Sequence, residues 1–152
     1  MISWRLVRAR YAASAFSGEG ARRYGGRWNS PGTPIVYTSA HLSLASLETL
    51  VHVQPLMPRD LFSVFQVEWD ERFMQSLEEK SLPKDWRSEP PGTGTMRLGD
   101  LWFRESRSAV LRVPSVLVPE EANYLLNPRH PDYERISIVK TREFFFDPRL
   151  SG

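Results

Sequence analysis

The sequence contains no cysteine among its 152 residues. Disulfide bonds, thiolate metal sites and a cysteine nucleophile are therefore excluded. No apolar run approaches the roughly 20 residues that cross a bilayer. The first ten residues, MISWRLVRAR, carry charge too early for a secretory signal. We therefore expect a cytoplasmic protein that makes no membrane contact and folds without covalent cross-links.

Several motifs that often mark active sites are also missing. The chain has no GxSxG elbow, no P-loop and no GxGxxG, which argues against the common hydrolase, nucleoside-triphosphatase and Rossmann classes. It has no HExxH, and His41 and His52 stand eleven positions apart with no third ligand in register. His130 lies in the proline-bracketed segment NPRHP, where a surface turn is the better interpretation. We therefore expect no metal site.

The composition is that of an ordinary globular protein. Hydrophobic residues make up 41% of the chain and charged residues 25%. The length suits one domain with a real core and is short for two. We therefore predict a single compact domain over residues 1–152.

Positive charge is concentrated at the start of the chain. Six arginines precede residue 28, against one acidic residue, Glu19; they are Arg5, Arg8, Arg10, Arg22, Arg23 and Arg27. A planar guanidinium group suits phosphates and carboxylates, so an anionic ligand or an acidic partner is one interpretation. A solubilising surface is the other.

Strand-like and helix-like segments follow one another irregularly. Residue type and alternation predict strands at 3–9, 34–39 and 61–69, two pieces within 109–119 divided at Pro114, and strand-like segments in 134–148. Helical spacing predicts helices at 41–53, 72–80 and 95–108, with loops at 17–26 and 81–94 and a turn with one helical coil at 120–133. Because no regular βαβ rhythm is present, the pattern favours an α+β fold.

The helix expected at 41–53 carries a carboxylate close to its apolar side. Glu48 lies about 40° from Leu44 and about 60° from Val51 on an ideal helix. Together with Leu47, those two residues are expected to form the stripe that faces the core. Glu48 would then either border a binding cleft or be a boundary charge that bends out to water.

A loop rich in turn-forming residues precedes this helix. The segment GGRWNSPGTPIVYTS crowds glycines and prolines around Arg27, Trp28 and Tyr37. Arg27 is followed by Tyr37 ten residues later, by Glu48 after eleven more, and by Ser115 in RVPSVLVP. This order resembles the RES-domain proteins, named for an arginine, a glutamate and a serine, which are the toxin halves of bacterial toxin–antitoxin pairs.

The resemblance extends over nearly the whole chain. Its supporting segments are GGRWNSPGTPIVYTS, SLASLETLVH, PSVLVPEEANYLLNPRHP and the closing FFFDPRL. None of them is specific alone, and their order and spacing carry the resemblance. The loop from Leu82 to Thr95 is its least familiar part.

The resemblance implies a fold and a reaction. The fold would be similar to that of ADP-ribosyltransferases, with a mixed sheet and a cleft that holds NAD. NAD would be a substrate, with no cofactor required, and the bond between nicotinamide and ribose would break. Water, phosphate or a protein would accept the ADP-ribose.

The resemblance also implies roles for individual residues. Glu48 would stabilise an oxocarbenium-like ribose through preorganised charge, and Arg27 would hold the pyrophosphate with its fork. Tyr37 would stack on nicotinamide, Ser115 would orient Glu48 or bind the substrate, and Trp28 would add to the NAD site.

Each of these residues has a plainer alternative. Tyr37 could be an inward-facing strand aromatic, Ser115 a turn hydroxyl after proline, and Trp28 a core residue. Asn123 and Asn127 are more typical of caps and turns, and we leave them out of the site.

The leading hypothesis is therefore a toxin that cleaves NAD, as a glycohydrolase or a phosphorylase, and arrests growth by depleting it. The family implies a cognate antitoxin with a helix-turn-helix DNA-binding domain, which would form a hetero-oligomer with this chain and contact nucleic acid in its place. One alternative is an ADP-ribosyltransferase that modifies a host protein.

A nucleic-acid-binding or ribonuclease-type toxin is the other alternative. It would need a general base near a phosphate site, and His41, His52 and His130 stand in no recognisable catalytic arrangement.

Overall fold

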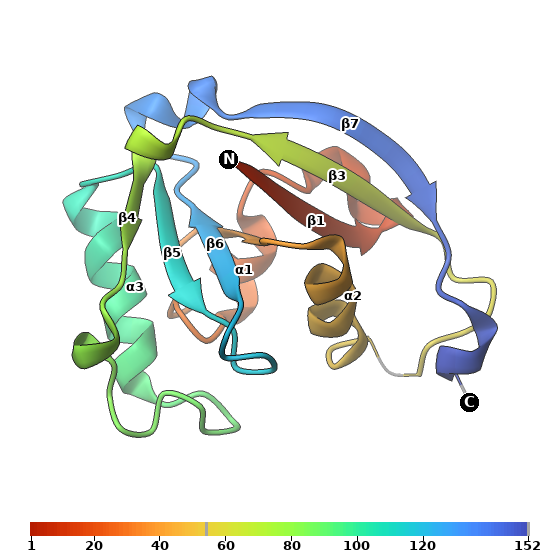
Figure 1. Ribbon diagram of the computed structural model, residues 1–152, viewed down its shortest axis with the longest axis horizontal. Helices are drawn as coiled ribbons and strands as arrows, with labels where there is room; N and C mark the ends of the chain where they lie inside the picture. Colours follow the sequence, from red (N-terminus) through yellow and green to blue (C-terminus); the bar gives the residue numbers. More distant parts are fainter. Residues whose placement is uncertain (54, 152) are drawn as a thin grey trace.

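The computed structural model describes residues 1–53 and 55–151 (Figure 1). The described residues form a seven-stranded sheet in the order β4-β5-β6-β2-β1-β3-β7. The strands are β1 (Ile2–Arg8), β2 (Val36–Ser39), β3 (Phe62–Glu68), β4 (Met74–Ser76), β5 (Val110–Pro114), β6 (Ala122–Leu126) and β7 (Ser137–Phe144). Strands β4 and β5 are parallel, and every other neighbouring pair is antiparallel. The sheet is mixed, so the predicted α+β class is confirmed.

Short helices cover this sheet. The α-helices are α1 (Glu19–Tyr24), α2 (Leu42–Leu50) and α3 (Thr93–Glu105), and 3₁₀ turns lie at Ala9–Ser14, Glu71–Phe73, Glu79–Ser81, Pro131–Arg135 and Pro148–Ser151. Helix α2 packs on β1 and β2, and α3 lies beside β4 and β5 (Figure 1). Within the part of the chain that the structure describes, no helix has the length and apolar character to cross a membrane.

The sheet changes direction where β1 meets β2. Seven residue pairs align β1 with β3, whereas β1 and β2 align at the pair Trp4 and Ser39. In Figure 1, β1, β3 and β7 run across the direction of β4, β5 and β6. A connection this short lets the two halves of the sheet face each other.

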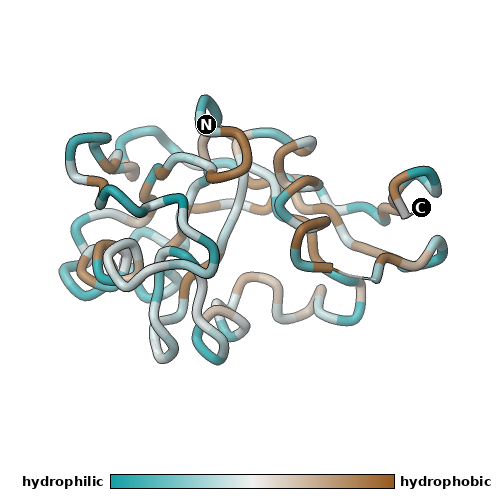
Figure 2. The backbone as a smooth tube through the Cα atoms, turned by 90° about the horizontal axis from the view of Figure 1, so that it is seen from below, coloured by the Kyte–Doolittle hydropathy of each residue, from teal (hydrophilic) through white to brown (hydrophobic). Residues whose placement is uncertain are grey.

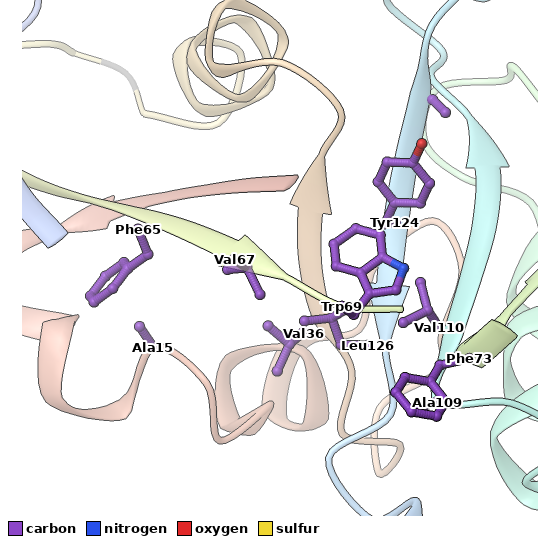
Figure 3. Packing of buried hydrophobic residues seen from close by; sticks show 11 residues of the cluster. Ala15, Val36, Phe65, Val67, Trp69, Phe73, Ala109, Val110, Tyr124 and Leu126 are labelled. Atoms are coloured by element: carbon purple, nitrogen blue, oxygen red, sulfur yellow. The ribbon is translucent and has the colours of Figure 1, made fainter. Parts of the chain in front are cut away.

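Three apolar clusters fill the spaces that this geometry creates. The first lies between the two halves of the sheet (Figure 3), where Val36, Tyr124 and Val110 from one half meet Phe65 and Val67 from the other. The second lies beneath α2 and contains Leu6, Ala45, Phe62 and Val64. The third lies beneath α3 and contains Trp28, Ile35, Trp102, Leu111 and Leu125. Because successive strand residues point to opposite faces, one strand serves two clusters.

The sequence places most of these elements correctly. The predicted strands at 3–9, 34–39 and 61–69 are β1, β2 and β3, and the predicted helix at 95–108 is α3. The helix predicted over 41–53 is α2, although it ends at Leu50. In Figure 2 the hydrophilic stretches of the tube lie mainly at peripheral turns, as the turn-forming composition of those segments requires.

Four local predictions are wrong. The segment 17–26 is not all loop, because its glycines flank α1: Gly18 and Gly25 adopt positive φ on either side of the helix. The segment 72–80 is not a helix, since β4 pairs with β5 at its centre. Pairing with a distant strand overrides the local helical preference there.

The segment 120–133 and the second half of 109–119 were also assigned incorrectly. Residues 120–133 contain β6, which lies between β5 and β2 in the sheet. A strand buried on both faces lacks the polar alternation that identifies strands in a sequence. The second half of 109–119 forms bends and a turn after Pro114, with no strand.

Helix α3 and the loop around Trp28 approach so closely that only glycine fits at position 99. A Cβ on Gly99 would lie 1.6 Å from the backbone oxygen of Trp28. We expect Gly99→Ala to lower the free energy of unfolding by about 1–3 kcal/mol or more, since the helix must shift outwards. Urea or thermal denaturation measures the effect.

Gly20→Ala is the matched control, because a Cβ on this glycine of α1 meets nothing within 4 Å. It should leave stability unchanged or raise it by up to about 1 kcal/mol through helix propensity. Equal stabilities for the two variants would contradict the close approach.

Candidate functional site

Helix α2 presents a short face to the sheet, and this face contains Glu48. Leu44 and Ala45 are buried, whereas Leu47 is 46% exposed and Val51 53% exposed. The predicted core-facing stripe is therefore wrong at Leu47 and Val51. Ala45 and Leu47 lie about 200° apart around a helix, so both cannot face the sheet. Glu48 lies near the direction of Leu44 and is half-buried.

Two side chains donate hydrogen bonds to the same oxygen of Glu48. The Ser115 hydroxyl donates to Oε1 at 2.8 Å, and Nδ2 of Asn123 donates to it at 2.8 Å. Ser115 is fully buried in the turn after β5, and its oxygen also accepts the backbone N–H groups of Leu117 and Val118, at 3.1 and 3.2 Å. The turn that follows Pro114 is thus organised around the hydroxyl that contacts the carboxylate.

The other carboxylate oxygen has a different environment. No residue within 1–53 or 55–151 donates a hydrogen bond to Oε2 of Glu48. An ionised carboxylate only accepts hydrogen bonds, and each oxygen has room for about two. Oε1 is therefore saturated by the protein, while Oε2 retains its capacity for an external donor.

Asn123 is the residue that the sequence analysis missed. That analysis assigned residues 120–133 to a turn, where asparagine has a local role, whereas Asn123 lies on the central strand β6. Ala122, Tyr124 and Leu126 are buried on one face of β6 and Leu125 is buried on the other, so no polar alternation marked the segment as a strand that carries Asn123.

Tyr37 lies on the same face of β2 as Ser39, two residues along the strand. Its hydroxyl donates to Oδ1 of Asn29 at 2.6 Å and accepts the backbone N–H of Trp28 at 3.2 Å. Burial raises the pKa of the Tyr37 phenol above its ordinary value. The phenol is therefore a neutral donor at physiological pH, and its ring is half-buried.

Arg27 holds the loop that precedes α3. Its Nη1 donates to the backbone oxygens of Trp86 and Ser88, at 3.0 and 2.7 Å, and its Nη2 contacts Oε2 of Glu89 at 2.9 Å. The side chain of Arg27 is 14% exposed and that of Glu89 is 76% exposed. The Arg27 side chain thus anchors the loop 82–92 by binding the backbone oxygens of that loop.

The same loop also reaches the turn that holds Glu48. Nη2 of Arg87 donates to the backbone oxygen of Val116 at 3.1 Å, one residue after Ser115. A hollow of about 240 Å³ borders this junction, lined by Leu77, Glu79, Leu82, Trp86, Arg112, Pro114 and Pro119. The loop therefore connects the surroundings of Arg27 with those of Glu48.

Trp28 lies in the core. It is 3% exposed and packs with Trp102, Ile35 and Leu125 in the cluster beneath α3. The prediction that Trp28 binds NAD does not fit this position, because the ring offers almost no surface to a ligand. The position of Trp28 is instead that of a core residue, as the plainer alternative predicted.

The other arginines near the N-terminus are engaged within the chain. Arg22 and Arg23 pair with Glu19, and Arg8 pairs with Asp60. Arg5 donates to the backbone oxygens of Ala15 and Tyr37, at 2.6 and 2.7 Å, and burial lowers its pKa to about 10. These arginines are therefore paired within the chain and do not form one open basic surface.

Comparison with known proteins identifies relatives over the whole length. The RES domain family model matches residues 2–147. The chain is 44% identical over 151 residues to a protein named "Toxin Res" from Yersinia enterocolitica, covering 99% of each chain. It is 41% identical over 153 residues to the "Prs ADP-ribosylating toxin" of Sphingobium sp., covering 97% of this chain and 94% of the relative. The predicted resemblance is confirmed.

A solved structure supports the fold. The crystal structure of the M. tuberculosis MbcT-MbcA toxin-antitoxin complex contains a chain that superposes with a TM-score of 0.78 at 17% identity. The match covers 95% of this chain and 84% of that one. At this identity the likeness establishes a shared fold.

The hydroxyl of Tyr37 should contribute measurably to stability. In Tyr37→Phe, Oδ1 of the buried Asn29 and the N–H of Trp28 lose their partner. The Asn29 amide cannot turn over to compensate, because its Nδ2 already donates to three backbone oxygens. We expect the free energy of unfolding to fall by about 1–3 kcal/mol.

Denaturation by urea measures this loss, with Tyr24→Phe as the control because Tyr24 is exposed. Equal stability of the two variants would show that the Tyr37 hydroxyl is dispensable.

Proposed function

Because the chain belongs to the RES domain family, we propose that it is a toxin that cleaves NAD at the nicotinamide–ribose bond. The observation that carries the proposal is the Glu48 carboxylate, whose Oε1 is held by Ser115 and Asn123 while Oε2 accepts from no described residue. The relative named as an ADP-ribosylating toxin supports NAD as the substrate, since ADP-ribosylation draws ADP-ribose from NAD.

The chemistry of the reaction suits a fixed carboxylate. Nicotinamide leaves as a neutral amine, because its ring already carries the positive charge, so no general acid is required. The ribose develops oxocarbenium character as the bond breaks. A carboxylate that accepts a ribose hydroxyl at Oε2 stabilises this charge, and a preorganised group needs no reorientation during the reaction.

Tyr37 and Arg27 would bind the two parts of the dinucleotide. The Tyr37 hydroxyl is already engaged within the protein, which leaves the ring to stack against nicotinamide. The Arg27 contact with exposed Glu89 is the one that an anionic ligand could replace, while the contacts with the Trp86 and Ser88 oxygens persist. The pyrophosphate of NAD would then replace the Glu89 carboxylate as the partner of Arg27.

A protein acceptor is the second candidate function. The name of the Sphingobium relative favours transfer of ADP-ribose to a target. The same bond breaks in both reactions, and only the acceptor differs. The structure adds no support for the ribonuclease alternative, since Arg8, Arg22 and Arg23 pair with carboxylates of this chain.

A cognate antitoxin is the proposed partner. The relatives named as toxins and the structural neighbour solved as a toxin-antitoxin complex support this proposal. Leu47 on α2 and Leu117 in the turn after β5 are exposed, and they lie close in sequence to Glu48 and Ser115. An apolar segment of an antitoxin with a helix-turn-helix domain would cover this position and exclude NAD. Acidic residues of the same segment would pair with arginines such as Arg27.

The charge of Glu48 should be essential for NAD cleavage. In Glu48→Gln the shape remains and the amide oxygen still accepts from Ser115 and Asn123, but the negative charge is lost. We expect nicotinamide release to fall by about 100-fold or more. Chromatographic detection of nicotinamide, with water, phosphate or cell protein as acceptor, measures the rate and identifies the product.

Glu143→Gln on exposed β7 is the matched control and should retain full activity. Wild-type protein that releases no nicotinamide with any acceptor would refute the proposed function. A folded Glu48→Gln variant with near-wild-type turnover would refute the role of Glu48.

Expression without the antitoxin should arrest growth. We expect the cellular NAD level to fall before growth stops, and co-expression with the neighbouring reading frame to restore both. Co-purification of that product with a tagged form of this chain tests the complex. Harmless expression of an enzyme that cleaves NAD in vitro would contradict the toxin assignment.

A further inference from the structure

We propose that Asn123 is a positioning residue for Glu48 and is itself supported by a hydrogen bond from Ser39. This inference rests on the proposed cleavage of NAD. Nδ2 of Asn123 donates to Oε1 of Glu48 at 2.8 Å, and its Oδ1 accepts the Ser39 hydroxyl at 2.7 Å.

The three side chains form a chain with one consistent direction. The carboxylate can only accept, so the NH₂ end of the amide must face it. The amide oxygen then faces Ser39, which must donate, and a hydroxyl can do so. Turning the amide over would place its oxygen against the carboxylate oxygen, which cannot donate. The Ser39 hydroxyl can donate or accept, so it is the carboxylate that sets the direction of the amide.

The sheet fixes both ends of this contact. Asn123 lies opposite Ser39 of β2 and opposite Val113 of β5, so its backbone is paired on both sides. Ser39 is also paired with Trp4 of β1, and its side chain is buried. Asparagine and serine have few rotatable bonds, so little conformational entropy is lost in holding them.

The second donor gives the carboxylate a defined plane. With Ser115 alone, the carboxylate could rotate about its Cγ–Cδ bond and exchange its two oxygens. Asn123 approaches from β6 and Ser115 from the turn after β5, and both contact Oε1. Two donors from different elements fix the direction of Oε2, the oxygen that accepts from no described residue.

The test is the isosteric substitution Asn123→Asp, which keeps shape and replaces the donor by an acceptor. We expect kcat for nicotinamide release to fall about 10- to 100-fold, the value of a hydrogen bond to a charged group. The KM for NAD should change less than kcat. Asn123→Ala removes the donor without adding charge and should give the same pattern.

A double-mutant cycle separates positioning from a general structural effect. In the Glu48→Gln background, Asn123→Ala should have little further effect on kcat, because the group that it orients has already lost its charge. Ser39→Ala should lower kcat. Ser39→Thr keeps the hydroxyl, so its kcat should be closer to that of the wild type than the kcat of Ser39→Ala. When Ser39→Ala is combined with Asn123→Ala, kcat should fall little below that of Asn123→Ala alone.

The contact itself has a signature that does not depend on activity. The side-chain NH₂ resonances of Asn123 in a ¹⁵N–¹H spectrum should move in Glu48→Ala and stay in place in Glu143→Gln. Unmoved resonances in Glu48→Ala would overturn the inference.

The outcomes distinguish the inference from the proposed function. Wild-type protein without NAD cleavage overturns both. Wild-type cleavage that is lost in Glu48→Gln but retained at wild-type kcat in folded Asn123→Asp and Asn123→Ala overturns the inference alone. A fall in kcat that is equally large in the Glu48→Gln background also overturns it.

Discussion

The pairing of Trp4 with Ser39 joins the two halves of the sheet, and the rest of the molecule is arranged around it. Because this ladder is short, β1 and β3 can turn across β5 and β6 and enclose the first apolar cluster. The same junction places the Ser39 side chain beside Asn123. The bend in the sheet and the support of Glu48 therefore depend on one position.

The polar groups around Glu48 are held by an otherwise apolar framework. Ser115 and Ser39 are buried, and a buried polar group is costly unless it is hydrogen-bonded. Each hydroxyl meets this demand. Ser115 contacts Glu48 of α2 and two backbone N–H groups of its own turn, and Ser39 contacts Asn123 of β6. The hydrogen bonds that satisfy these buried hydroxyls therefore also orient the Glu48 carboxylate.

The sequence predicts this protein unevenly, and the reasons are physical. Strand β1 was readable because its residues alternate, and β2 and β3 were readable because they are rich in β-branched and aromatic residues. Strand β6 was not, because central position in a sheet removes the polar alternation that marks a strand. Strand β4 depends on its distant partner β5, which no local window contains.

The candidate site was also only partly predictable from the sequence. The family resemblance predicted Glu48, Arg27, Tyr37 and Ser115 as site residues, and the structure joins Glu48 to Ser115 directly. Asn123 was missed because its importance depends on the placement of β6. Trp28 was assigned to the site because a glycine-rich loop suggests exposure, whereas the close packing of that loop against Gly99 of α3 buries the ring.

The contacts of Arg27 with the loop before α3 bear on how that loop can diverge among related proteins. Two of its three contacts are made to the backbone oxygens of residues 86 and 88, and every amino acid supplies such an oxygen. Substitutions at these positions leave the acceptors in place. An insertion or a deletion between them would displace an acceptor from the guanidinium. For these two contacts the spacing of the loop is therefore constrained, while the amino-acid identities at positions 86 and 88 are not.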